Sequence, residues 1–231
     1  MTSQRGIALI MVVLITAFLS ALGLGLLLSV FMDRLATGNM AASVAMFYAA
    51  DAGIELAAHE LALTPEWTDV LSASARSSFA DGAPGGIRGL PGEGTIDLTA
   101  ETNTLNCGQP TACTAAQMNA NSRVRPWGVN NPRWQLYAYG LMGNLSQLIR
   151  PAPCYLVVWV ADDGREQDGD PMVDAKVEGE SGHGIVRIRA EVFGRAGSRR
   201  AIEAELARVC VTGVGEGCVA GIRVQSWHEL R

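Results

Sequence analysis

The sequence predicts an α+β protein in which a long N-terminal α-helix packs on a C-terminal antiparallel β-sheet. An uncharged apolar run fills residues 7–32, and residues 33–63 continue with good helix formers and no proline. From residue 134 onward the chain changes to short runs of aromatic and β-branched residues, which are typical of strands. A chain of 231 residues has room for one core with its appendages.

The apolar run from Ile7 to Met32 is long enough to cross a membrane. Its 26 residues include no Asp, Glu, Lys, Arg or His. As a helix they would extend about 39 Å, compared with roughly 30 Å for the hydrocarbon core of a bilayer. Arg5 is the one charged residue before the run, so the positive-inside rule places the N-terminus in the cytoplasm by a narrow margin. A secretory signal peptide is the alternative, although the run exceeds the usual apolar region of about 7–15 residues and no A-x-A-like cleavage site is evident.

The helix is expected to continue past the membrane as an amphipathic segment over residues 33–63. Small and apolar residues gather on one face of this segment, so it needs a partner surface, and the sheet is the obvious one. Thr64 and the proline after it predict the start of a short helix that runs to about Phe79. The rest of residues 64–133 is rich in Gly, Pro and Asn, which predicts a variable loop region with a short strand at Thr95–Thr99.

Residues 134–231 are predicted to form the antiparallel sheet. Trp134–Leu141 and Cys154–Val160 have the composition of strands, and the second is apolar on both faces, as a strand covered on each side would be. Ile185–Phe193 and Arg199–Val209 are predicted to pair as a hairpin around a glycine-containing turn.

Alternation of apolar and charged residues in the hairpin, residues 185–209, defines a register. It places Arg189 opposite Glu203 and Arg187 opposite Glu205, as two cross-strand ion pairs. A helix over residues 201–209 is the alternative, because Ala, Glu and Leu favour helices. The side chains expected to point inward are Val186, Ile188, Ala190, Val192, Ile202, Ala204 and Leu206.

An acidic loop occupies residues 162–174. Dense carboxylates are the hard oxygen ligands that Ca²⁺ prefers, so the loop is a candidate calcium site. The spacing of its central acids is similar to that of an EF-hand loop, but Pro171 stands where the glycine is expected. A solvated loop without metal is the alternative, and no other cofactor is expected. The candidate ligands are Asp162, Asp163, Glu166, Asp168, Asp170 and Asp174.

Five cysteines, none in a CxxC pattern, indicate an oxidising compartment. The odd number leaves at least one cysteine unpaired or in an intermolecular bond. Cys107 with Cys113 and Cys210 with Cys218 would leave Cys154 free, but a bond between Cys154 and a later cysteine is equally allowed. The spacing does not choose among these pairings.

Composition and motifs argue against two functional classes. The net charge of −5 lacks the cationic footprint of a nucleic-acid-binding protein, so no nucleic-acid partner is expected. The three histidines, His59, His183 and His228, are scattered along the chain. Gly213–Gly217 is a glycine-rich turn without the helix pattern of a phosphate-binding loop. No catalytic set is present, and we expect no enzymatic activity.

The first sixty residues resemble those of type IV pilus minor pilins of the PilX-like family. The segment Arg5–Ile10 is similar to a prepilin processing site, in which a short basic leader ends in glycine before a long apolar helix. Thr37–Asn39 and Ala49–Gly53 are similar to the GN and AAEAG-like steps of that family. The resemblance implies a pilin-like fold, a leader over residues 1–6, cleavage between Gly6 and Ile7 by a prepilin peptidase, and methylation of the new amine.

The resemblance also implies a location and a set of partners. A minor pilin is anchored in the inner membrane by its apolar helix, with its remaining chain in the periplasm, and then joins a pilus at the cell surface. Its partners would be other minor and major pilins and the assembly platform. A signal-anchored periplasmic receptor, sensor or adhesion domain is the rival interpretation, and such a protein would keep its N-terminus uncut.

Met11 is a departure from the family pattern. Most pilins carry Glu at the fifth mature position, where the carboxylate is thought to neutralise the amine of a neighbouring subunit. In lacking this Glu, the chain resembles subunits at the filament tip, such as the K-type pseudopilin of type II secretion. We therefore expect this chain to prime or cap a filament instead of forming its shaft. The alternative is that Met11 is tolerated at an ordinary position.

Overall fold

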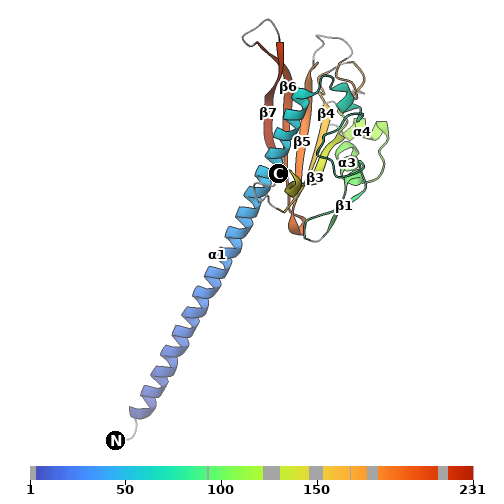
Figure 1. Cartoon of the computed structure of the whole chain (residues 1–231). Helices are drawn as coiled ribbons and strands as arrows, with labels where there is room; N and C mark the ends of the chain where they lie inside the picture. The colour runs from blue at the N-terminus through green and yellow to red at the C-terminus, as the bar shows by residue number, and fades with distance from the viewer. Residues whose placement is uncertain are drawn as a thin grey trace. The chain divides into compact units, whose positions relative to one another are not determined.

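The computed structural model describes residues 4–92, 94–121, 131–145, 153–166, 168–175, 182–212 and 218–230. The chain divides into two compact units, Met1–Val44 and Ala45–Arg231. Helix α1, Gln4–Leu63, begins in the first unit and ends in the second (Figure 1). All strands and the remaining helices belong to the second unit.

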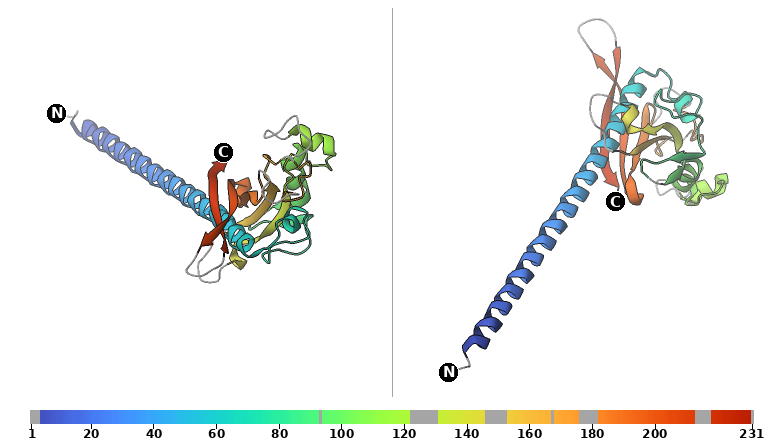
Figure 2. Two further views of the ribbon diagram at one scale, coloured as in Figure 1. Left: turned by 90° about the horizontal axis from the view of Figure 1, so that it is seen from above. Right: turned by 60° about the horizontal axis from the view of Figure 1, so that its bottom comes forward.

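The second unit contains a five-stranded sheet in the order β3-β4-β5-β6-β7, and every neighbouring pair is antiparallel (Figures 1 and 2). The predicted α+β fold is therefore confirmed. Residues 201–209 are strand, so the helix alternative for them is wrong. β7 was not predicted. The strands are β3 (Gln135–Leu141), β4 (Tyr155–Asp162), β5 (Ile185–Phe193), β6 (Arg199–Thr212) and β7 (Cys218–Leu230).

Short elements connect α1 to the sheet. The helix predicted from Thr64 to about Phe79 is wrong, because α2 has four residues and the Thr64 hydroxyl instead donates to the Glu60 carbonyl at the end of α1 (2.9 Å). The strand predicted at Thr95–Thr99 stops at Asp97, whose carboxylate caps the following helix. The connecting elements are α2 (Thr68–Leu71), β1 (Ile87–Gly89), β2 (Thr95–Asp97), α3 (Leu98–Cys107) and α4 (Ala115–Asn121). Within the sheet region, η1 (Met142–Asn144) follows β3 and η2 (Arg195–Gly197) lies between β5 and β6.

The C-terminal part of α1, from Ala45 to Leu63, packs on the sheet through Met46, Ile54 and Leu61 and through small residues between them. Ala50 and Ala57 are fully buried there. A Cβ atom added to Gly53 would lie 2.7 Å from Leu156 Cδ1. This is closer than carbon atoms can pack, so glycine allows α1 to approach β4. The amphipathic character expected over residues 33–63 is confirmed from Ala45 onward, whereas residues 33–42 are exposed on every side.

The connection that follows α1 is held by a side chain from β6. The Arg208 guanidinium donates to the carbonyls of Pro65 and Thr64 and lies 4.5 Å over the Trp67 ring. The Trp67 indole in turn donates to the Leu61 carbonyl in the last turn of the helix (3.0 Å). Arg208 therefore fixes the connection, and Trp67 links it to the end of α1.

The predicted hairpin register is confirmed, but the predicted ion pairs are wrong. Arg189 is opposite Glu203 and Arg187 is opposite Glu205, and the seven residues expected to point inward are all buried in the core. However, Arg187 pairs diagonally with Glu203, and Arg189 pairs with Glu191 on its own strand (3.0 Å). Long side chains reach diagonal neighbours as easily as opposite ones, and Arg187 also lies 5.5 Å from the Trp134 ring centre.

β4 is buried along its whole length, as predicted for a strand covered on both faces. One face packs against α1, where Leu156 and Val158 join the main core. The other face forms a second apolar cluster, in which Trp159 and Tyr155 pack with Leu98 at the start of α3. The connection between α1 and β3 therefore supplies a second layer of core.

Candidate functional site

The N-terminal part of α1 has no apolar partner within its own unit. Residues from Ile7 to Met32 are all exposed, and none of them carries a charge. This segment is long and apolar enough to cross a membrane. Its burial must come from lipid or from other chains, because exposed apolar surface of this extent is unfavourable in water. A single-pass anchor is consistent with this segment.

Two hydroxyl groups in this segment are satisfied within the helix. The Thr16 hydroxyl lies 3.0 Å from both the Val12 and Val13 carbonyls, and the Ser20 hydroxyl donates to the Thr16 carbonyl (2.8 Å). Hydrogen bonds to the preceding turn allow Ser and Thr to enter hydrocarbon without an unsatisfied donor. Thr16 and Ser20 therefore do not exclude the segment from a membrane.

The proposed processing residues lie at the start of α1. The helix begins at Gln4, so the Gly6–Ile7 bond is in its first turn. The first four backbone N–H groups of a helix have no intrahelical acceptor, so this turn opens at little cost. Met11 lies four residues after Ile7, on the same face and one turn along, with 62% of its surface exposed. It offers no charge to the positive end of the helix dipole.

The acidic loop is not a solvated loop. Asp162, Asp163, Glu166 and Asp174 are all buried, with Asp162 only 1% exposed. The solvated alternative is therefore wrong for these four, while Asp168 and the remaining acid, Asp170, are half-buried. Burial of a carboxylate is unfavourable unless hydrogen bonds or counter-charges compensate it.

The loop carboxylates accept hydrogen bonds from nearby backbone N–H groups. Such bonds fix the backbone and satisfy donors that the irregular loop leaves free. They are Asp163 N to Asp162 (2.9 Å), Asp170 N to Asp168 (2.8 Å), Met172 N to Asp170 (3.2 Å), Ala175 N to Glu166 (3.1 Å) and Gly184 N to Asp174 (2.7 Å). The acidic residues therefore hold the loop together, which is a structural role.

Burial nevertheless disfavours the charged form of these carboxylates. Burial, together with the charge of Glu166, raises the pKa of Asp162 to about 9. Burial also raises the pKa of Glu166 to about 7 and that of Asp174 above its usual value. Arg165 compensates Asp163, from which its Nε lies 3.0 Å. Proton uptake or a bound cation would relieve the remaining repulsion.

The described parts of the chain contain no group of three or more acidic, His or Cys side chains placed to hold a metal ion. The carboxylates of Asp162, Glu166 and Asp174 each accept a hydrogen bond from a backbone N–H group. Calcium needs six to eight oxygen ligands, so binding would require some of these bonds to be exchanged. Calcium binding stays a prediction.

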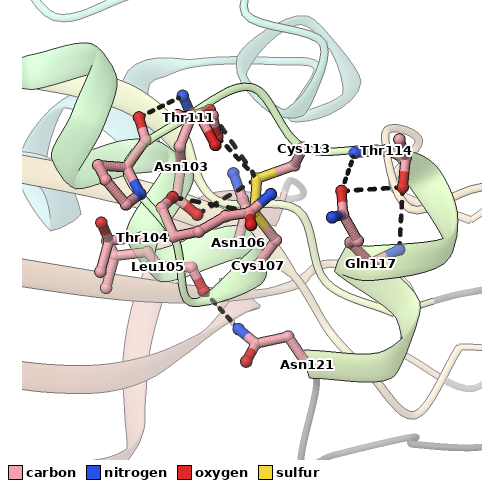
Figure 3. Close-up of a disulfide and its surroundings, with 12 residues drawn as sticks. Asn103, Thr104, Leu105, Asn106, Cys107, Thr111, Cys113, Thr114, Gln117 and Asn121 are labelled. Carbon is pink, nitrogen blue, oxygen red and sulfur yellow. Dashed lines mark hydrogen bonds between the residues drawn. A yellow bond between two sulfur atoms is a disulfide. The ribbon is translucent and has the colours of Figure 1, made fainter.

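One disulfide, Cys107–Cys113, joins the end of α3 to the loop before α4, with its Cα atoms 6.0 Å apart (Figure 3). Cys154 is buried with a free thiol, and burial raises its pKa to about 11. Of the pairings that the sequence left open, Cys107 with Cys113 is therefore the one present, and Cys154 is the unpaired cysteine. The side chains of Cys210 and Cys218 lie outside the described residues.

The disulfide loop is also held by hydrogen bonds that sequence reasoning missed. Thr114 N donates to the Gln117 side chain (2.8 Å) and Gln117 N donates back to the Thr114 hydroxyl (3.3 Å), which is a capping box at the start of α4 (Figure 3). Asn121 donates to the Leu105 carbonyl across the loop (3.3 Å). The T-x-x-Q spacing of residues 114–117 is the signal that could have predicted α4.

The histidines lie on different elements and are exposed: His59 on α1, His183 in the loop before β5 and His228 on β7. Gly213–Gly217 lies outside the described residues. No protein-family model matches this chain, and it has no match among curated proteins or solved structures. The functional conclusion therefore rests on the anchor helix, the sheet that its second half contacts, and the disulfide.

Proposed function

We propose that this chain is a minor pilin that primes or caps a type IV pilus or a related pseudopilus. The observation that carries this proposal is the construction of α1. One helix of 60 residues combines an uncharged, exposed apolar half with a half that packs on an antiparallel sheet. A subunit that leaves a membrane to enter the helical core of a filament needs this combination.

The residues that carry the family resemblance also have a physical reason in this fold. Ala49–Gly53 lies where α1 meets the sheet, with Ala50 fully buried and Gly53 against Leu156. The disulfide between Cys107 and Cys113 supports an extracytoplasmic location for the second unit, because thiols stay reduced in most cytosols. Both features suit a subunit whose sheet domain is outside the inner membrane.

Met11 supports a position at the end of the filament. After cleavage at Gly6, the new amine of Ile7 would lie at the positive end of the helix dipole. A carboxylate at position 11 would compensate a neighbouring amine, whereas Met11 contributes only apolar surface. A subunit with no neighbour above it does not require that carboxylate.

The test is N-terminal sequencing and intact mass measurement of protein extracted from membranes of producing cells. We expect the chain to begin at Ile7 and to carry one added methyl group. Gly6→Leu should abolish cleavage, whereas Gly25→Leu should not, since nothing lies within 4 Å of that glycine in the same helix. A chain that begins at Met1 or Thr2 would contradict the proposal and favour an uncut receptor, sensor or adhesion domain.

The tip position has a separate test. Met11→Glu should increase the amount of this subunit along the filament shaft, as measured by immunogold labelling of purified filaments. Met11→Gln is the matched control, because it adds polarity without charge and should leave the distribution unchanged. Abundant labelling of the native subunit along the shaft would overturn the tip role while leaving the pilin proposal intact.

A further inference from the structure

The two edges of the sheet differ in how their backbone groups are satisfied. At the β3 edge, Tyr139 N donates to the Phe79 carbonyl (2.9 Å) and Asp81 N donates to the Tyr139 carbonyl (2.9 Å). A bridge between Ala80 and Tyr139 extends the sheet there. The segment before β1 therefore covers this edge with backbone hydrogen bonds.

The β7 edge is open. β7 pairs with β6 over its whole length of 13 residues, and no other described segment pairs with it. Every second residue of an edge strand directs its N–H and C=O groups away from the sheet. Figure 1 shows β7 as the last strand of the sheet. Within the part of the chain that the structure describes, a row of unpaired backbone donors and acceptors therefore lies along it.

The usual devices that protect an open edge are sparse in β7. The strand is long, and it contains no proline and no lysine, the residues that most often block edge pairing. Its residues 223–228 are exposed without alternation, and they include Val224 at 47% and Trp227 at 42%. One bulge is present, since the pairing shifts between Glu205 and Leu206 and leaves Gln225 as the extra residue.

We propose that the free edge of β7 binds an extended segment of another protein, which adds to the sheet as a further strand. Hydrogen-bond complementarity identifies the partner as a strand, because the open backbone groups are spaced for another extended backbone. This proposal goes beyond the pilin assignment and does not depend on it.

The side chains that border the edge define the chemistry of the added strand. On the face towards α1, the Trp227 ring contacts Phe47 edge to face (centroids 5.7 Å), and Phe47 contacts Tyr48 in the same way (5.5 Å). Tyr48 is exposed. Asp51 fixes the indole by accepting a hydrogen bond from Trp227 Nε1 (3.2 Å). Side chains of the partner beside Val224 and Trp227 should be apolar or aromatic, whereas Glu229, paired with Arg200, makes the end of this face polar.

The opposite face of β7 is polar and selects a different residue type. The register places Ser226 and His228 on this face, opposite Glu205 and Glu203. Arg223 also lies on this face and is exposed, and it forms no ion pair with any described residue. A carboxylate on the partner would satisfy it. The partner strand should therefore alternate apolar residues towards α1 with polar or acidic residues on the other side.

The test is amide hydrogen exchange of the full chain, resolved to single residues. Protein in membranes of producing cells is compared with the same protein purified in detergent. We expect alternate amides of β7 to exchange at least about tenfold more slowly in the membranes, with a two-residue period. The amides of β5 report that the fold is retained, because that strand is paired on both sides. Equal β7 rates in both samples would overturn the proposal.

A pair of variants tests the edge directly. Val224→Lys places a charge beside the edge and should abolish the added protection. Ile87→Lys changes an even more exposed apolar residue, on β1, and should retain it. Protection of β7 without the two-residue period would indicate side-chain docking and contradict strand addition. If protection of β7 appears in detergent as the concentration of the purified chain rises, the added strand comes from a second copy of this chain. That result would contradict the proposal that another protein supplies it.

The exchange pattern is independent of processing at Gly6. A chain that retains residues 1–6 and still shows periodic protection of β7 would refute the pilin assignment and support strand addition. A chain that begins at Ile7 but shows no periodic protection of β7 would support the pilin assignment and refute strand addition. The two proposals therefore fail separately.

Discussion

The two halves of α1 differ in burial. Residues 7–32 carry large aliphatic and aromatic side chains that are exposed, whereas the second half buries both large residues, such as Ile54 and Leu61, and the small residues Ala50, Gly53 and Ala57 against the sheet. Lipid chains and other helices can rearrange around large exposed side chains. The position of β4 is fixed by the core of the sheet, so α1 needs a glycine where it meets Leu156. The first half must therefore be buried by other molecules, and the second half is buried by the sheet.

The strongest test of this contrast is a large side chain at Gly53. Gly53→Leu would place carbon atoms against Leu156, and we expect it to lower the free energy of unfolding by about 3 kcal/mol, at the upper end for overpacking. Gly38→Leu is the matched control in the same helix, because nothing lies within 4 Å of that glycine. It should be neutral or stabilising by up to about 1 kcal/mol. Denaturant unfolding of the full chain in detergent measures both, and equal effects would contradict the contrast.

The second test concerns the end of the packed half. Arg208→Ala removes the donor to the Thr64 and Pro65 carbonyls and the cation over Trp67. We expect a loss of about 2 kcal/mol in the free energy of unfolding. Arg223→Ala, on exposed β7, should change it by less than about 0.5 kcal/mol. If both variants unfold alike, the connection after α1 is not held in this way.

The stability of the sheet domain should depend on pH. The apolar segment Ile7–Met32 should not contribute to this dependence, because it has no charged residue. The folded pKa of Asp162 is raised to about 9 from an ordinary value of 3.8. The folded state therefore binds more protons than the unfolded state between these values, and stability falls as pH rises from about 4 to about 9. Asp162→Asn should flatten this decline and be more stable than the native chain near pH 8. Thermal unfolding with chelator present measures it.

Asp33→Asn serves as the control for that measurement, because Asp33 is exposed on α1. It should leave the slope of stability against pH unchanged. A native chain whose stability is level or rises between pH 5 and pH 8 would show that the Asp162 carboxylate is compensated in solution by a group or ion that offsets its burial.

The smallest expected effect is that of calcium on the acidic loop. If the loop exchanges backbone bonds for a cation, millimolar Ca²⁺ should raise the melting temperature by about 2–4 °C, equivalent to about 1 kcal/mol. Asp168→Ala should abolish this rise. Asp69→Ala, at an exposed site outside the loop, should retain it. No difference between Ca²⁺ and Mg²⁺ at equal concentration would argue against a dedicated site.

The features that sequence predicted are those with a strong periodic pattern. The apolar run of α1 and the alternation of Ile185–Phe193 with residues 199–209 each follow one period, and both were confirmed. β7 was missed because residues 223–228 are exposed without alternation, so they carry no two-residue pattern. Helix α3 was missed because it buries one residue, Leu98, and its Thr and Asn residues are poor helix formers.

The site was predictable only in part. The acidic residues were recognised, but their burial was not, because it depends on how residues 162–175 fold against later parts of the chain. The ion-pair partners of Arg187 and Arg189 were wrong for a related reason. Register fixes which Cα atoms are opposite, whereas Trp134 and Glu191 decide where the guanidinium groups lie. Tertiary neighbours of this kind leave no local signal.

The contact between Arg208 and the connection after α1 has a mechanical consequence. Tension along α1 would pass into the domain through its packed residues 45–63 and through the short connection after Leu63. Because Arg208 binds the carbonyls of Thr64 and Pro65, part of that load passes sideways into β6. β6 is bonded on both sides, to β5 and β7, so the force would be shared among three strands. Pulling on the helix would then shear a sheet instead of unravelling a loop.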